Sequence, residues 1–119
     1  YCLLRAFGPA YIGTAREPFT NWSWKRLTQP LGGPAMIQLP GGTLLGAGRR
    51  YLPDKVRTTS IVHVDPDRGR IYELLRLPSG GDTSYPGMVY HEGGIYMTYY
   101  SSHEGKSKIY FAKVAVSKE

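Results

Sequence analysis

Few side chains of this sequence have the chemistry of a catalytic or metal-binding group, and most of those stand in turns. His91-Glu92 is followed directly by two glycines, and His103-Glu104 by one. The two glycines exclude a helical His-Glu-x-x-His zinc motif at the first pair. The second pair is either a solvated turn or the rim of a binding site. The single cysteine, Cys2, leaves the redox compartment open. We predict no metal, no cofactor and no Ser/His/Asp or Cys/His arrangement.

The net charge points to the chemistry of a partner. Lysine and arginine outnumber aspartate and glutamate by 15 to 9, which gives a formal charge of +6. Such a balance favours acidic partners such as sialic acids, uronic acids, sulfated glycans or nucleic acid, and a solvated basic surface explains it equally well. The basic residues are scattered and form no stripe interleaved with aromatic residues, so we predict no nucleic-acid partner. The sequence contains no run of about 18 apolar residues, so we predict no membrane span.

The elements that must position these groups are repeated hairpins. The passage 34–45 returns as 86–97 with a constant offset of 52 residues. Each copy is an apolar run, a Gly-Gly turn and a second apolar run, which is typical of a β-hairpin. A period near 50 residues indicates a propeller or an array of small sheets, which must stack because none can bury its own faces.

Short strands between turns account for nearly the whole sequence, and no segment has helical periodicity. The expected strands are 3–5, 10–14, 22–27, 35–38, 44–48, 59–64, 71–77, 88–90, 95–100 and 108–116. Breaks are expected at 30–34 and 79–82. Because four antiparallel strands make a propeller blade, we predict one all-β domain, a partial β-propeller of about three blades. The expected blades are about 1–29, 34–78 and 84–117, the first without its innermost strand and the last without its outermost.

One turn carries a known side-chain pattern. The segment 65–72 reads Asp-Pro-Asp-Arg-Gly-Arg-Ile-Tyr and resembles a degenerate Asp-box, the Ser-x-Asp-x-Gly-x-Thr-Trp hairpin of sialidase-type propellers. In such a turn the aspartate accepts hydrogen bonds from turn amides, the glycine takes a positive φ, and the aromatic residue packs beneath. The box is a structural feature and not a catalytic one.

The order of elements along nearly the whole chain resembles the C-terminal half of a sialidase (neuraminidase). Arg5 ends the first strand, Arg57 opens the strand before the box-like turn, and Tyr85 opens the last repeat. The most specific part is that last repeat, where 80–87 reads Gly-Gly-Asp-Thr-Ser-Tyr-Pro-Gly and 99–106 reads Tyr-Tyr-Ser-Ser-His-Glu-Gly-Lys. The resemblance implies part of a six-bladed propeller that binds or hydrolyses acidic carbohydrate.

The same resemblance implies roles for these residues. In the sialidase family three arginines bind the substrate carboxylate and a tyrosine is the nucleophile, so Arg5 matches the second arginine, Arg57 the third and Tyr85 the nucleophile. A phenol suits an anomeric carbon that bears a carboxylate, because that carboxylate would repel an acidic nucleophile. Arginine pairs with a carboxylate in a planar, bidentate way. Candidates for the rim of the site are Asp82, His103 and Glu104.

The family supplies its first arginine and its acid/base aspartate from earlier blades, and its activating glutamate precedes the second arginine. This sequence has no counterpart of them, so we expect no hydrolysis by the chain alone. A homodimer or missing N-terminal blades would complete the ring. Three hypotheses stay open: part of a sialidase-like glycoside hydrolase, a non-catalytic glycan-binding propeller built from several copies, and a purely structural propeller. Under the last, Arg5 and Arg57 are ordinary strand-edge arginines and Tyr85 is a packing residue between blades.

Overall fold

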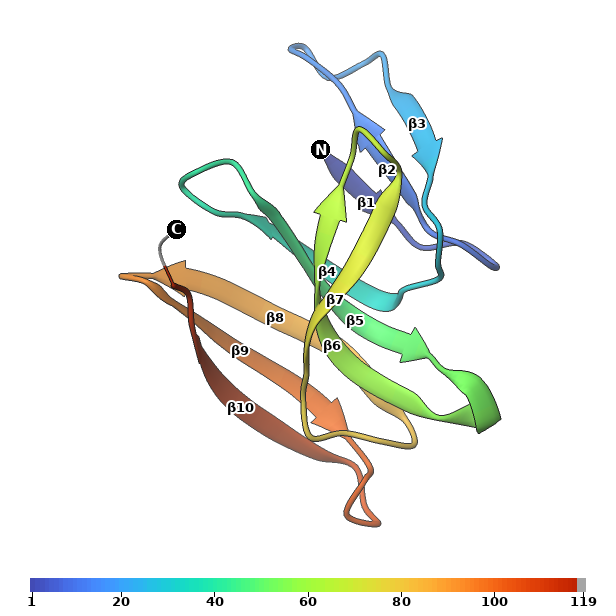
Figure 1. Cartoon of the computed structure of the whole chain (residues 1–119), viewed down its shortest axis with the longest axis vertical. Helices are drawn as coiled ribbons and strands as arrows, with labels where there is room; N and C mark the ends of the chain where they lie inside the picture. The colour runs from blue at the N-terminus through green and yellow to red at the C-terminus, as the bar shows by residue number, and fades with distance from the viewer. Residues whose placement is uncertain (118–119) are drawn as a thin grey trace.

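The computed structural model describes residues 1–117, and most of them lie in strands. The strands form three open antiparallel sheets of three, four and three strands (Figure 1). The first sheet contains β1 (Cys2–Leu4), β2 (Tyr11–Thr14) and β3 (Ser23–Arg26). The second contains β4 (Gly32–Gln38), β5 (Leu44–Tyr51), β6 (Arg57–Asp65) and β7 (Arg70–Arg76). The third contains β8 (Thr83–His91), β9 (Gly94–Ser101) and β10 (Lys108–Ala115).

The predictions of an all-β chain and of strands grouped as three, four and three are confirmed. Strands that follow one another in the sequence are also neighbours in each sheet, as expected when short turns join antiparallel strands. In the described part of the chain the helical element is one short 3-10 turn, η1 (Pro53–Lys55). The same residues include no helix with the length and apolar character needed to cross a membrane.

Two strands begin earlier than expected, inside segments that the sequence analysis treated as breaks or left outside strands. β4 begins at Gly32 and β8 at Thr83, and each continues through a proline. The pairing register shifts between Gly32 and Ala35, and again between Ser84 and Gly87, which marks a β-bulge in each strand. A proline lacks an N–H group and is tolerated at a bulge, so it does not end the strand there.

The two sequence repeats fold into comparable hairpins with different turns. In the first copy Gln38 pairs with Leu44, which leaves residues 39–43 in the loop. In the second copy His91 pairs with Gly94, which leaves Glu92 and Gly93, both with positive φ. Positive φ at both residues of a two-residue loop is typical of a type I′ hairpin turn. On the turn side of the bulges, the strand pairing of the two hairpins is therefore shifted by one residue: Gln38 pairs with Leu44, but its counterpart Tyr90 pairs with Ile95 and not with the counterpart of Leu44.

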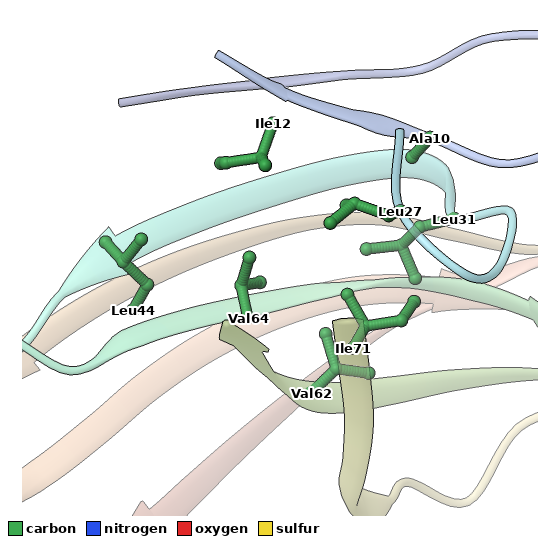
Figure 2. Packing of buried hydrophobic residues seen from close by; sticks show 8 residues of the cluster. All are labelled: Ala10, Ile12, Leu27, Leu31, Leu44, Val62, Val64 and Ile71. Atoms are coloured by element: carbon green, nitrogen blue, oxygen red, sulfur yellow. The ribbon is translucent and has the colours of Figure 1, made fainter. Parts of the chain in front are cut away.

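The middle sheet packs on both of its faces. Figure 2 shows the core that it forms with the first sheet, in which Ala10, Ile12 and Leu27 lie against residues of the middle sheet and its entry loop. The remaining members of this core are Leu31, Leu44, Val62, Val64 and Ile71. The core with the third sheet contains Leu45, Ala47, Ile61, Leu77, Ile95, Met97 and Tyr99. Because successive residues of a strand point to opposite faces, β5 and β6 supply side chains to both cores.

The Asp-box-like turn joins β6 to β7 and lies against β3. Asp65 Oδ1 accepts hydrogen bonds from the amides of Asp67 and Arg68, each at 3.1 Å, and Gly69 has a φ of +67°. Lys25 Nζ, on β3, donates to Asp67 O at 2.6 Å. The glycine has its expected positive φ, but the carboxylate that accepts from the turn amides is that of Asp65, at the serine position of the box, and not that of Asp67, at its aspartate position. Tyr72, which was expected to pack beneath the turn, is instead exposed and stacks on His63, with 6.1 Å between ring centroids.

Candidate functional site

Arg5 and Tyr85 meet although they belong to the first and third sheets. Arg5 directly follows β1, and its Nη1 donates a hydrogen bond to Tyr85 Oη at 3.2 Å. Tyr85 is the third residue of β8 and is 62% exposed. The resemblance to sialidases pairs these two positions in one site, and the structure brings them into direct contact.

The backbone of Tyr85 is held in an unusual conformation. Its φ is +49°, at the bulge of β8. A bulky residue in this region costs on the order of 1–3 kcal/mol and persists only where its surroundings hold it. Ser84 supplies such a hold, because its buried Oγ donates to Gly32 O at 2.6 Å and lies 3.2 Å from Gly33 O. The strain is located at the residue with the candidate chemistry.

A second tyrosine supports the Tyr85 ring. Tyr100, on β9, stacks on it with ring centroids 6.0 Å apart and an interplanar angle of 18°. Tyr100 Oη donates to Asp82 Oδ1 at 2.5 Å. Burial raises the pKa of Tyr100, and the hydrogen bond to Asp82 adds to the rise. Tyr100 is therefore a neutral donor that ties the rim residue Asp82 to the ring stack.

Arg49 joins this group and was missed in the sequence analysis. Its Nε donates to Thr83 O at 2.8 Å. Its Nη2 lies 3.1 Å from Tyr100 Oη and 3.4 Å from Asp82 Oδ1, and its Nη1 lies 3.4 Å from Tyr51 Oη. The expected strand 44–48 stopped one residue short of Arg49, whereas β5 runs to Tyr51. Extending the alternation of β5 would have placed Arg49 on the face toward the third sheet.

Arg57 reaches the same region less directly. It opens β6, and its guanidinium carbon lies 4.8 Å from the centroid of the Tyr51 ring, a cation–π geometry. Its Nη1 donates to Val56 O at 3.1 Å. Arg57 is thus linked to Tyr85 only through a series of contacts, by way of Tyr51, Arg49 and the stacked Tyr100, and not by a direct hydrogen bond.

A cavity of about 610 Å³ opens beside Arg5 and Tyr51. Its lining residues are Arg5, Ala6, Phe7, Gly8, Pro30, Leu31, Gly32 and Tyr51. Arg5 is the one charged side chain in this lining, and the other walls are mostly apolar or backbone. Apolar walls around one charged group are a feature of small-molecule sites, but this hollow is open to solvent, since Phe7 in its lining is fully exposed.

The rim candidates separate into two places. Asp82 lies in the network just described. His103 and Glu104 instead contact Tyr110: the His103 ring centroid lies 4.8 Å from that of Tyr110, and Tyr110 Oη donates to Glu104. Tyr110 pairs with Tyr99, one position along from Tyr100, so it projects from the opposite face of the sheet.

The arrangement presents a guanidinium, an exposed phenol and an apolar cavity at one place, which suits an anion with a bulky body. Residues 1–117 contain no group of three or more His, Cys, Asp and Glu side chains suited to a metal ion. Comparison of the chain with models of protein families and with curated proteins finds no match.

Proposed function

We propose that this chain forms the carboxylate-binding side of a sialidase-like site for acidic glycans. The observation that carries the proposal is the hydrogen bond from Arg5 Nη1 to Tyr85 Oη. It joins, across three sheets, an arginine and a tyrosine of the types that such a site requires. A sugar carboxylate would pair with Arg5 in a bidentate way. Its anomeric carbon would then face the exposed Tyr85 hydroxyl.

The proposed architecture is a partial propeller. Three antiparallel meanders stack in sequence order, and the middle one has the four strands of a blade. Residues of β4 and β8 meet at their bulges, where Ser84 bonds Gly32. Neighbouring blades of a propeller place their equivalent strands side by side around the axis. In this proposal the full ring has six blades and is completed by further blades or by a second copy of the chain.

We further propose that the chain does not hydrolyse glycosides by itself. Hydrolysis needs an acid for the leaving oxygen and a base for the phenol, and such general acid/base help contributes about 10²–10⁴-fold. The carboxylate of Asp82 is engaged by Arg49 and Tyr100, and that of Glu73 by Arg76 and Ser60. The hydrogen bond to the Tyr85 hydroxyl comes from a cation, Arg5, which is not a base.

A direct binding experiment tests the proposal. N-acetylneuraminic acid and glucuronic acid serve as acidic probes and glucose as the neutral one, each titrated into the isotope-labelled chain and followed by NMR. Arg5→Ala should weaken binding of the acidic sugars by about 10–100-fold, because a charged hydrogen bond contributes about 1.5–3 kcal/mol. Arg70→Ala is the matched control, since Arg70 is exposed at the start of β7. Equal losses in the two variants would contradict the proposal.

The second candidate is a non-catalytic glycan-binding propeller assembled from several copies. It is favoured by the chemistry of the group that contacts the Tyr85 hydroxyl, because a guanidinium can bind an anion but cannot act as the base that activates a phenol. The two candidates differ in their response to added blades. Hydrolysis of an aryl sialoside that appears when N-terminal blades are supplied, and disappears in Tyr85→Phe, supports the hydrolase. Binding without hydrolysis under the same conditions supports the lectin-like protein.

A further inference from the structure

We propose that Arg49 is the positioning residue of this site: it holds the ring stack that presents Tyr85 to the ligand. The inference rests on the proposed function and adds a residue that does not itself have to touch the sugar. Arg49 stands on β5 of the middle sheet, whereas its partners Thr83, Asp82 and Tyr100 belong to the third sheet or its entry. It is the arginine that fixes one sheet against the other at the mouth of the site.

The geometry uses the whole guanidinium. Nε donates to a backbone carbonyl, Thr83 O, two residues before Tyr85. Nη2 lies between the Tyr100 hydroxyl and the Asp82 carboxylate, which are themselves hydrogen-bonded. Nη1 reaches Tyr51 Oη, on the wall of the cavity. A planar fork with several donors can make these contacts at once, and a lysine ammonium on a flexible stem cannot.

The contacts of Arg49 affect the position of Tyr85 in two ways. Tyr100 carries the stacked ring, so a shift of its hydroxyl changes the surface on which the Tyr85 ring rests. Thr83 fixes the backbone just before the bulge where Tyr85 takes its positive φ. If Arg49 is replaced, we expect the Tyr85 ring to lose its fixed orientation and Oη to leave Arg5.

The chain provides a matched control in the next residue. Arg50 has a side chain 12% exposed, close to the 15% of Arg49, and it also contacts a residue outside its own sheet, in the loop between β3 and β4. Its Nη2 donates to Gln29 Oε1 at 2.6 Å, and its Nη1 lies 3.8 Å from Glu73 Oε2. As the neighbour of Arg49 on β5, it points to the opposite face. Arg50→Lys therefore makes the same chemical change at similar burial, away from the site.

The test compares Arg49→Lys with Arg50→Lys in the full chain labelled with ¹³C-tyrosine. Without any sugar, Arg49→Lys should shift or broaden the Tyr85 and Tyr100 ring signals, and Arg50→Lys should leave both unchanged. With N-acetylneuraminic acid, Arg49→Lys should weaken binding about tenfold and Arg50→Lys less than twofold. Tyr100→Phe, which removes one hydroxyl and keeps the ring, is the second variant in case Arg49→Lys fails to fold. It should perturb the Tyr85 signal in the same direction.

Two outcomes separate the two proposals. If the unaltered chain binds no acidic sugar, the proposed function fails, and the tyrosine spectra still decide the role of Arg49. If Arg49→Lys leaves the Tyr85 ring signal unchanged, or if Arg50→Lys perturbs it equally, the positioning role is wrong whatever the chain binds.

Discussion

Gly33 and Tyr85 occupy the same place in two facing bulges, and each has a φ of +49°. They are equivalent in the 52-residue repeat, so one copy has glycine where the other has an exposed tyrosine. A Cβ added at Gly33 would stand 3.1 Å from two carbons of the Tyr85 ring and 2.9 Å from Ser84 Oγ. The glycine at the bulge of β4 thus leaves the space in which the Tyr85 side chain, at the bulge of β8, lies against it.

This relationship predicts a site-specific effect of Gly33→Ala. The left-handed conformation alone costs a non-glycine residue about 1–2 kcal/mol, and the close contacts displace the Tyr85 ring. Chemical denaturation should show that loss of stability, and sugar titration should show weaker binding. Gly41→Ala is the control, because a Cβ there meets nothing within 4 Å. A Gly33→Ala chain as stable as Gly41→Ala would contradict the tight facing of the bulges.

The hydrogen bond from Tyr110 to Glu104 predicts an unusual titration. It raises the pKa of Tyr110 to about 12 and lowers the pKa of Glu104 below its ordinary value. The tyrosine contribution to stability is then complete below the unfolded pKa near 10 and is lost as the pH rises toward 12. The Glu104 contribution is present above its unfolded pKa and is lost as the pH falls through its folded pKa.

The ultraviolet absorbance of tyrosinate measures this titration directly. We expect one tyrosine to titrate near pH 12 and to return toward its ordinary range in Glu104→Gln. Glu92→Gln, in the exposed turn between β8 and β9, should leave the curve unchanged. A Glu104→Gln curve that overlaps that of the unaltered chain would show that the bond does not form in solution.

The Asp-box-like turn predicts acid sensitivity. The pKa of Asp65 is lowered, chiefly by the hydrogen bond from the Arg68 amide and further by that from Asp67. Its contribution to stability is present above the unfolded pKa near 3.9 and is lost as the pH falls through the lower folded pKa. Asp65→Ala should lower the melting temperature at pH 7, and the difference from the unaltered chain should vanish at strongly acidic pH. Asp67→Ala is the control, because it keeps the two backbone amides, those of residues 67 and 68, that donate to Asp65. An equal loss of stability in this variant would contradict the role of the Asp65 carboxylate.

The outer faces of the end sheets predict self-association. Val89, Ile109 and Phe111 are exposed on the third sheet, and Leu4 and Trp24 on the first. Apolar sheet faces of this kind invite a partner. We expect light scattering to show a mass that rises with concentration and that falls toward the monomer in Phe111→Asp. Tyr72→Asp, an exposed change on the middle sheet, should not have this effect. A monomeric chain at all concentrations would overturn the expectation.

The sequence predicted the strands well because alternating apolar residues and glycine turns act locally. Prediction from the sequence failed where packing between sheets, and not the local residue pattern, decides the structure. Gly32 and Pro34 looked like a break, yet a bulge carries β4 through them. Arg49 seemed to lie beyond its strand, so its inward direction was missed. The contact of Arg5 with Tyr85 spans 80 residues and depends on how three sheets stack, which no local pattern encodes.

The double burial of the middle sheet also protects its register. Leu44 belongs to the core with the first sheet, and Leu45 to the core with the third. A slip of β5 by one residue would exchange the side chains of both cores at once, because the side-chain period of a strand is two. A shift of one residue would put Gly46 at the place of Leu45 on the face toward the third sheet, and Ala47 at the place of Gly46 on the face toward the first. Both cores therefore fix the register of β5. Because Arg49 lies on β5, the same register directs its side chain toward the third sheet and the candidate site.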